Sequence, residues 1–141
     1  MPKKILVAED DKVMIHLLRY KLQSEGYEVV VCNNGLTAKQ TLHEQQFDAV
    51  LLDLMLPLIN GFELLEIVRT ELNSKVPIIV ISATPLREII EKALDLGAND
   101  FVAKPFTPVE LLSKIESLTT EKKTFIKFSE GSRDDSAELA N

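Results

Sequence analysis

Several short segments of this chain are apolar without interruption, and this lack of alternation is the feature that most limits the possible folds. Residues 5–8, 49–52 and 78–81 read ILVA, AVLL and IIVI. A strand with one face in water alternates apolar and polar side chains, whereas a strand of a parallel sheet is covered on both faces. The segments therefore predict a parallel sheet with helices packed on both of its sides.

Patterns of helical spacing separate the apolar segments. We expect strands at residues 3–8, 27–31, 47–52, 78–81 and 101–103, and helices at 11–25, 35–45, 62–72, 85–96 and 107–118. In the first helix Met14 and Leu17 belong to an apolar stripe that we expect in the core. In the fourth helix we expect one apolar face made by Leu86, Ile89, Ile90, Ala93 and Leu94. Gly26 and Gly97 are suited to end the helices that precede them.

Five strand–helix units with short connections predict an α/β fold: a doubly wound five-stranded parallel sheet with helices on both faces. Two strand orders are common in such sheets. The flavodoxin-like order 2-1-3-4-5 brings the carboxyl ends of the first and third strands together at its switch point. Acids follow both of these strands, Glu9-Asp10 after the first and Asp53 after the third. The positions of the acids therefore favour the order 2-1-3-4-5.

The same sheet edge collects the residues of a candidate phosphate site. Carboxylates of Glu9, Asp10 and Asp53 would repel one another there, and a hard cation such as Mg²⁺ relieves that repulsion. Lys104 follows the fifth strand and would supply positive charge for an anion. Ser82 ends the fourth strand and adds a hydroxyl group. Together these residue types predict a metal-dependent phosphate site.

Other polar residues have simpler interpretations. Asp11 stands at the start of the first helix and is expected to cap it. His16 and His43 are expected on the solvated surface, and Cys32 as a buried structural thiol. The Lys104-Pro105 bond lies at a strand end, where a cis peptide is a possibility.

Composition excludes several classes of function. The chain has 141 residues and a net charge of −6, which argues against nucleic acid or an anionic membrane as a direct partner. No apolar run approaches the roughly 20 residues of a membrane-spanning helix, and no export signal is evident. With one cysteine no internal disulfide can form, so we expect a cytoplasmic protein. We expect one domain over residues 1–119, followed by a polar tail or linker over residues 120–141.

The segments ILVAEDD, DAVLLDLMLPLINGFELL, VPIIVISAT and GANDFVAKPF resemble the receiver domain of two-component response regulators, a CheY-like superfamily. The resemblance covers residues 3 to about 119. It implies that Asp53 accepts a phosphoryl group from the phosphohistidine of a sensor histidine kinase or a phosphotransfer protein. It also implies that Asp10 binds Mg²⁺ directly, Glu9 through water, and Met55 through its backbone carbonyl.

The resemblance assigns roles to three more residues. Ser82 would hydrogen-bond one phosphoryl oxygen, Lys104 would pair with another, and Phe101 occupies an aromatic switch position. Phe101 stands where Tyr is frequent, so its equilibrium should depend more on packing than on hydrogen bonds. Ser82 replaces the frequent Thr and should keep the hydroxyl function. The implied protein is not an enzyme acting on other molecules, because it catalyses only its own phosphorylation and dephosphorylation.

Two other phosphate-handling classes fit less well. A haloacid-dehalogenase phosphohydrolase needs a second Asp two residues after its nucleophile, and Asp53 is followed by Leu54-Met55. A flavodoxin would need hydroxyls and donors after its first strand, where Glu9-Asp10-Asp11 would instead repel phosphate. A phosphorylation-independent receiver-like interaction module remains the open alternative to the switch.

The output of the protein is also open at this point. Residues 85–119 connect directly to Ser82, Phe101 and Lys104 and should respond most to a phosphoryl group. We expect exposed charges of both signs on this face: Arg87, Glu88, Glu91, Lys92, Asp95, Asp100, Glu110, Lys114 and Glu116. Such a face suits a phosphorylation-dependent homodimer, which Glu116 would weaken, with a heterologous partner as the rival. The polar tail favours a fragment of a longer regulator over a stand-alone protein.

Overall fold

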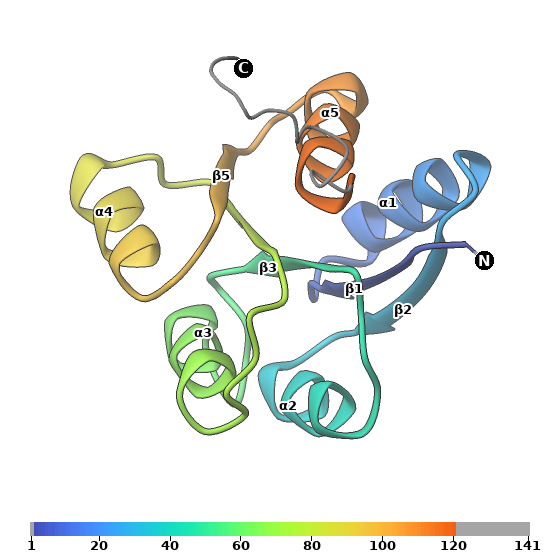
Figure 1. Cartoon of the computed structure of the whole chain (residues 1–141). Coiled ribbons are helices and arrows are strands. Elements are labelled where there is room, and N and C mark those ends of the chain that lie inside the picture. Colours follow the sequence, from blue (N-terminus) through green and yellow to red (C-terminus); the bar gives the residue numbers. More distant parts are fainter. Residues whose placement is uncertain (1, 121–141) are drawn as a thin grey trace, which may run out of the picture.

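The computed structural model describes residues 2–120, in which five strands alternate with five helices (Figure 1). None of the helices in this range is long and apolar enough to cross a membrane. The strands are β1 (Lys4–Ala8), β2 (Glu28–Cys32), β3 (Ala49–Asp53), β4 (Ile78–Ser82) and β5 (Asp100–Ala103). The helices are α1 (Lys12–Ser24), α2 (Gly35–Glu44), α3 (Gly61–Arg69), α4 (Arg87–Asp95) and α5 (Pro108–Thr119).

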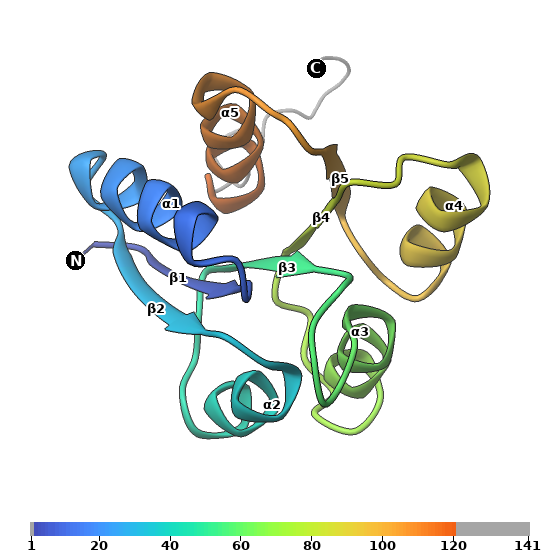
Figure 2. The same cartoon turned by 180° about the vertical axis from the view of Figure 1, so that it is seen from behind.

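All neighbouring strands are parallel, and their order in the sheet is β2-β1-β3-β4-β5. Helices α1 and α5 cover one face of the sheet, and α2, α3 and α4 cover the other (Figures 1 and 2). The predicted fold class, strand order and two-sided cover are therefore confirmed.

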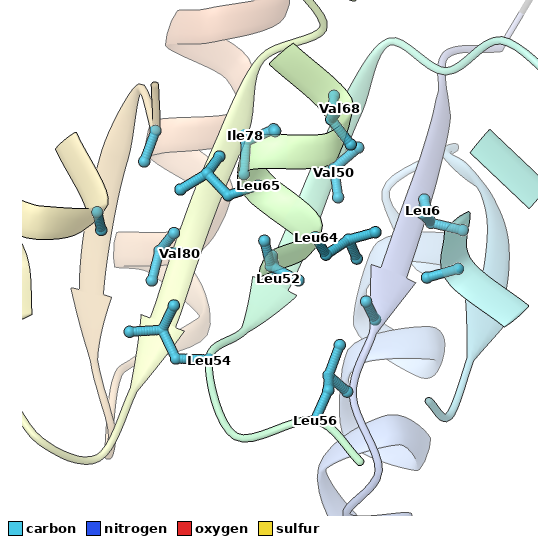
Figure 3. Close-up of a cluster of buried hydrophobic side chains, with 14 of the residues drawn as sticks. Leu6, Val50, Leu52, Leu54, Leu56, Leu64, Leu65, Val68, Ile78 and Val80 are labelled. Carbon is cyan, nitrogen blue, oxygen red and sulfur yellow. The ribbon is translucent and has the colours of Figure 1, made fainter. Parts of the chain in front are cut away.

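The core lies in two layers because each strand sends successive side chains to opposite faces. Figure 3 shows side chains of one of these layers, among them Val50 and Leu52 of β3 with Leu64 and Leu65 of α3. In β3, Val50 and Leu52 pack toward α2, α3 and α4, whereas Ala49 and Leu51 pack toward α1 and α5. Every residue of β3 and of β4 is buried. This burial explains why these strands are apolar throughout, and it leaves only their ends for polar chemistry.

Three predicted residues at helix ends have the expected roles. Asp11 caps α1, because its Oδ1 accepts hydrogen bonds from the Val13 N–H at 2.9 Å and the Met14 N–H at 3.3 Å. Gly26 and Gly97, which follow α1 and α4, have φ values of 92° and 113°. Such angles favour glycine, since a side chain would meet its own backbone there.

Two of the predicted apolar stripes were wrong in part. Leu17 is 56% exposed, because Leu18 and Leu22 are the α1 residues that face the sheet. Leu86 precedes α4 as its N-cap and is 56% exposed, and Leu94 is 45% exposed.

The third helix also ends earlier than predicted. It stops at Arg69 rather than at residue 72. The Arg69 side chain binds the carbonyl oxygens of Ser74 and Val76, and Asn73 adopts a left-handed φ of 49°. These contacts turn the chain back across the helix end, which a pattern of apolar spacing cannot reveal.

Candidate functional site

Three carboxylates meet at the carboxyl edge of the sheet. Glu9 and Asp10 follow β1, and Asp53 is the last residue of the adjacent β3. One oxygen from each of the three lies within 4.8 Å of the others. Glu9 and Asp53 are only 1% and 4% exposed, whereas Asp10 is open to solvent. The strand order thus brings together acids that stand 43 positions apart in the chain.

Lys104 lies against two of these acids. Its Nζ is 2.9 Å from Glu9 Oε1 and 3.0 Å from Asp53 Oδ2. Partial burial alone would lower the pKa of Lys104, but the two carboxylates outweigh that effect and raise it. The ammonium group therefore stays charged, as an anion-binding group must. The Lys104-Pro105 peptide bond is cis.

Glu9 is held in an environment that disfavours its charge. Burial and the neighbouring Asp53 raise the pKa of Glu9, while Lys104 and the Asp11 N–H act in the opposite direction. Its Oε2 accepts a hydrogen bond from that N–H at 3.1 Å. Its Oε1 contacts the Lys104 ammonium as an ion pair but accepts no well-oriented hydrogen bond within residues 2–120. A buried oxygen in this condition fits a cation ligand set.

Asp53 is fixed from both sides. Its Oδ1 accepts a hydrogen bond from the Met55 N–H at 2.9 Å, and its Oδ2 faces Lys104. The backbone around it is packed against Gly61, where an added Cβ would lie 2.5 Å from Leu54 Cα and 2.7 Å from the Asp53 carbonyl oxygen. The acidic side chain is therefore presented on a rigid support.

Ser82 ends β4 beside a cavity of about 500 Å³. The hydroxyl is buried, and its oxygen accepts a hydrogen bond from the Thr84 N–H at 3.0 Å. The polar lining of the cavity comes from Asp10, Asn60, Ser82 and Thr84, and its apolar lining from Leu54, Met55, Leu56, Pro57, Phe62 and Ile89. A small anion placed there would lie beside Asp10 and the Ser82 hydroxyl group.

Two predicted residues lie at the margin of this cluster. Phe101 is half-buried in β5 and packs against the core layer beneath α2, α3 and α4. The side chain of Met55 is 74% exposed and points away from the core. Phe101 therefore stands apart from the acids, with β4 between its strand and Asp53.

The charged face of residues 85–119 differs from the prediction at two positions. Asp100 and Lys114 were expected among its exposed charges, but both are half-buried. They form an ion pair with each other at 3.1 Å between Lys114 Nζ and Asp100 Oδ2. The cause is the packing of α5 beside β5, which brings the two side chains together within one chain.

The predictions for the two histidines and the cysteine are confirmed. His16 and His43 are exposed. Cys32 is 2% exposed, and burial raises the pKa of its thiol, which donates a hydrogen bond to Thr41 Oγ1. These features support a structural role for the cysteine.

Sequence reasoning missed Arg69, which connects α3 to the α4–β5 loop. Its guanidinium donates to the carbonyl oxygens of Gly97, Ser74 and Val76 and to Asn99 Oδ1, at 2.7–3.0 Å. Backbone carbonyls leave no trace in a residue pattern, so no signal in the sequence distinguished this arginine from a solvated one.

Sequence reasoning also missed the shape of the loop after Asp53. The Pro57 carbonyl oxygen accepts hydrogen bonds from the Gly35 N–H at 3.0 Å and from the Ile59 N–H at 2.9 Å. The second bond closes a three-residue turn in which Leu58 has a φ of 73°. A glycine at this position would have predicted such a turn, but a leucine does not.

Comparisons with known proteins agree with this geometry. A family model described as "Response regulator receiver domain" matches residues 5–116. A probable transcriptional regulator, ycf29 of Pyropia yezoensis, is 35% identical over 84% of this chain and 54% of its own. The DNA-binding response regulator MtrA of Mycobacterium tuberculosis is 35% identical over 83% and 50%. The chain thus spans about half the length of the curated relatives it matches.

Two solved structures are similar along nearly their whole length. The Francisella response regulator 1452 receiver domain has a TM-score of 0.79 and 31% identity, covering 83% of this chain and 96% of its own. The receiver domain of the sensor histidine kinase PA1611 from Pseudomonas aeruginosa has a TM-score of 0.78 and 32% identity, covering 84% and 98%. That second structure holds a magnesium ion coordinated in its active site cleft.

Proposed function

This chain belongs to the response regulator receiver domain family of two-component systems, and from that premise we propose that it is a switch controlled by phosphorylation of Asp53. The observation that carries the proposal is the position of the Asp53 carboxylate. It is buried at a strand end, paired with Lys104, and close to two further acids and a cavity. The donor would be the phosphohistidine of a sensor histidine kinase or a phosphotransfer protein.

The chemistry follows from these contacts. An oxygen of Asp53 attacks phosphorus as the bond to the histidine nitrogen breaks, which gives an acyl phosphate and free histidine. The transition state spreads negative charge over the three equatorial oxygens. Lys104 would neutralise one of them, and the Ser82 hydroxyl would donate a hydrogen bond to another. The chain would act only on itself, both in gaining and in losing the phosphoryl group.

Glu9, Asp10 and Asp53 fit Mg²⁺. Their oxygens lie close enough to share one ion. The buried Glu9 Oε1 contacts Lys104 but accepts no well-oriented hydrogen bond within residues 2–120. We assign Asp10 and Asp53 to direct contact, Glu9 to contact through water, and the Met55 carbonyl to a further ligand position. A bound Mg²⁺ would supply positive charge to the phosphoryl oxygens.

The phosphoryl group would act on residues 85–119. Lys104, which now pairs with Glu9 and Asp53, would turn toward an anion that enters. The Ser82 Oγ now accepts a hydrogen bond from Thr84, and its hydroxyl would donate one to the same anion. These residues lead directly into α4 and α5, and Phe101 lies between those helices in the chain. The changed face would then control a homodimer, a partner or an output domain.

The same proposal includes the bounds of the domain, its cellular location and its lack of direct nucleic-acid binding. The receiver domain would span residues 1–119. The polar tail or linker predicted for residues 120–141 lies, beyond Thr120, outside the residues that the structure describes. A cytoplasmic location suits a partner of a histidine kinase, and the net charge of −6 disfavours direct contact with nucleic acid. The match covers only half the length of the relatives described as DNA-binding, so their activity is not assigned to these residues.

A phosphodonor assay tests the proposal. Acetyl phosphate with Mg²⁺ should add one phosphate to the wild-type chain by intact mass, and none to Asp53→Asn. Asp95→Asn removes a carboxylate from the exposed part of α4 and should be labelled like the wild type. Label that persists in Asp53→Asn would refute the assignment. An unlabelled wild type would favour a phosphorylation-independent interaction module.

A further inference from the structure

Leu58 has an unusual conformation for its residue type. Its φ is 73°, in the region that favours glycine, and its side chain is 74% exposed. A bulky side chain at such an angle crowds its own backbone. Glycine or asparagine would form the same turn with less strain. The leucine is therefore not explained by the backbone that it forms.

Core packing does not explain the leucine either. Leu58 belongs to neither of the two buried clusters of residues 2–120. The loop is held instead by its neighbours, through the Gly35–Pro57 hydrogen bond and the close approach of Ile59 to Gly35. Strained residues that the fold does not need are concentrated at functional sites. The exposed side chain itself is thus the feature to explain.

Two other exposed apolar residues follow strands at the same edge of the sheet as Leu58. Met55 is 74% exposed in the same loop, and Val13 is 70% exposed in the first turn of α1. The strands that precede these residues, β1 and β3, are adjacent and also carry Glu9, Asp10 and Asp53. Apolar side chains therefore flank the acidic site on the loops that surround it.

We infer that Leu58 is an apolar anchor for the protein that donates the phosphoryl group, an inference that rests on the proposed function. A protein donor must cover the rim of the site to bring its phosphohistidine to Asp53, so it must contact the exposed loop. A small donor such as acetyl phosphate can enter without covering that rim. The partner surface that fits is an apolar patch beside a phosphohistidine, because burial of Leu58 and Met55 favours apolar contact.

The test compares two donors on the same variants. One donor is an autophosphorylated sensor histidine kinase, chosen because it phosphorylates the wild-type chain, and the other is acetyl phosphate. Leu58→Gly and Leu58→Asn remove the apolar side chain and tolerate the left-handed turn. Leu94→Gln removes a similar exposed leucine from the end of α4 and is the control.

Both Leu58 variants should accept phosphate from the kinase at least about fivefold more slowly, as expected for loss of a contact residue. Their rates with acetyl phosphate and their melting temperatures should not fall. Unchanged kinase rates would overturn the inference. An equal fall with both donors would also overturn it, because Leu58 would then shape the site. A wild-type chain that acetyl phosphate cannot label would instead refute the proposed function.

Discussion

At the residue scale, the site holds more negative charge than positive charge. Two buried carboxylates, Glu9 and Asp53, share the single ammonium group of Lys104. Asp10 adds further negative charge from the solvent side. The arrangement is suited to a cation and to an anion that arrive together, since each relieves the repulsion that the other would cause.

The pH dependence of stability should reveal this imbalance. The pKa of Glu9 is raised above 4.5 in the folded chain, so the folded state binds its proton more tightly than the unfolded state. Protonation of Glu9 therefore stabilises the fold. This contribution is fully present below pH 4.5 and is lost as the pH rises through the raised pKa of Glu9. Glu9→Gln removes that loss and should raise the free energy of unfolding at pH 8 by about 1 kcal/mol.

Urea denaturation without divalent cations measures this difference. The gain should disappear at pH values below 4.5, where Glu9 is protonated in both states. Glu91→Gln makes the same change of charge on the exposed face of α4 and should show no such dependence. A Glu9→Gln protein that is less stable than the wild type at pH 8 would contradict the prediction.

The Mg²⁺ affinities of single variants should distinguish an acid that binds the ion directly from one that binds it through water. If Asp10 binds Mg²⁺ directly and Glu9 through water, Asp10→Asn should weaken binding far more than Glu9→Gln. Asp11→Asn is the control, because Asp11 is occupied with the cap of α1. Asn caps a helix about as well as Asp, so this variant should change stability by less than about 1 kcal/mol and leave metal affinity unchanged. Calorimetric titration with Mg²⁺ measures all three, and equal losses for Asp10 and Glu9 would exclude the assignment.

The sequence predicted which residue types gather at the site, but not how each is held. Acids after apolar strands mark a sheet edge, so Asp10 and Asp53 were found from the pattern alone. The burial of Glu9 and the exposure of Leu17 depend on side-chain direction, which spacing does not fix. Arg69 escaped detection because its partners are mostly backbone carbonyls.

At the element scale, the loop between β3 and α3 owes its shape to two close contacts. An added Cβ at Gly35 would lie 1.8 Å from the Ile59 carbonyl oxygen, and one at Gly61 would lie 2.5 Å from Leu54 Cα. Both obstacles are backbone atoms, which cannot rotate away. The loop that follows Asp53 is therefore fixed at both of its ends.

Alanine variants should distinguish a glycine that lies against backbone atoms from one that does not. Gly61→Ala should lower the free energy of unfolding by about 2 kcal/mol or more, because backbone must move to admit the methyl group. Gly26 is the control, since its φ is 92° but nothing lies within 4 Å of an added Cβ. Gly26→Ala should cost only about 1 kcal/mol of conformational strain. Equal losses in chemical denaturation would show that the Gly61 contact relaxes easily.

Helix α4 shows where reasoning from periodicity failed. Its apolar residues have helical spacing, yet only Ala93 is fully buried. Its N-cap, Leu86, has no side chain that can satisfy the first backbone N–H groups. The helix is short and lightly attached, so the apolar pattern indicated its existence but overstated its packing.

At the scale of the whole molecule, the fold was predictable because every strand had a clear signal. Strand order followed from the acids, and the structure confirms it. The charged face of residues 85–119 was less predictable, since Asp100 and Lys114 pair within one chain. Reversing Lys114 would break that pair, so it is a poor probe of contacts between chains.

Glu116 is a better probe of the proposed homodimer. Glu116 is exposed on α5 and would weaken a two-fold contact by losing an ion pair. With beryllofluoride as phosphoryl mimic, Glu116→Lys should dimerise about fivefold more tightly than the wild type, equivalent to about 1 kcal/mol. Sedimentation velocity measures the affinity. Glu28→Lys makes the same charge change on β2 and should have no effect; a matching gain there would exclude the face of residues 85–119.

The burial of β3 has a consequence for the order in which parts of the molecule open. Amide protons exchange with solvent fastest where buried contacts are few, and slowest in the centre of the sheet. Every residue of β3 is buried, whereas β5 lies at the sheet edge and only Val102 is fully buried there. Asp53, the proposed phosphoryl acceptor, thus stands on a strand that we expect to open late, and Phe101 on one that we expect to open early. If the proposal holds, the phosphoryl group is received on well-protected backbone, and the response begins in backbone that opens more readily.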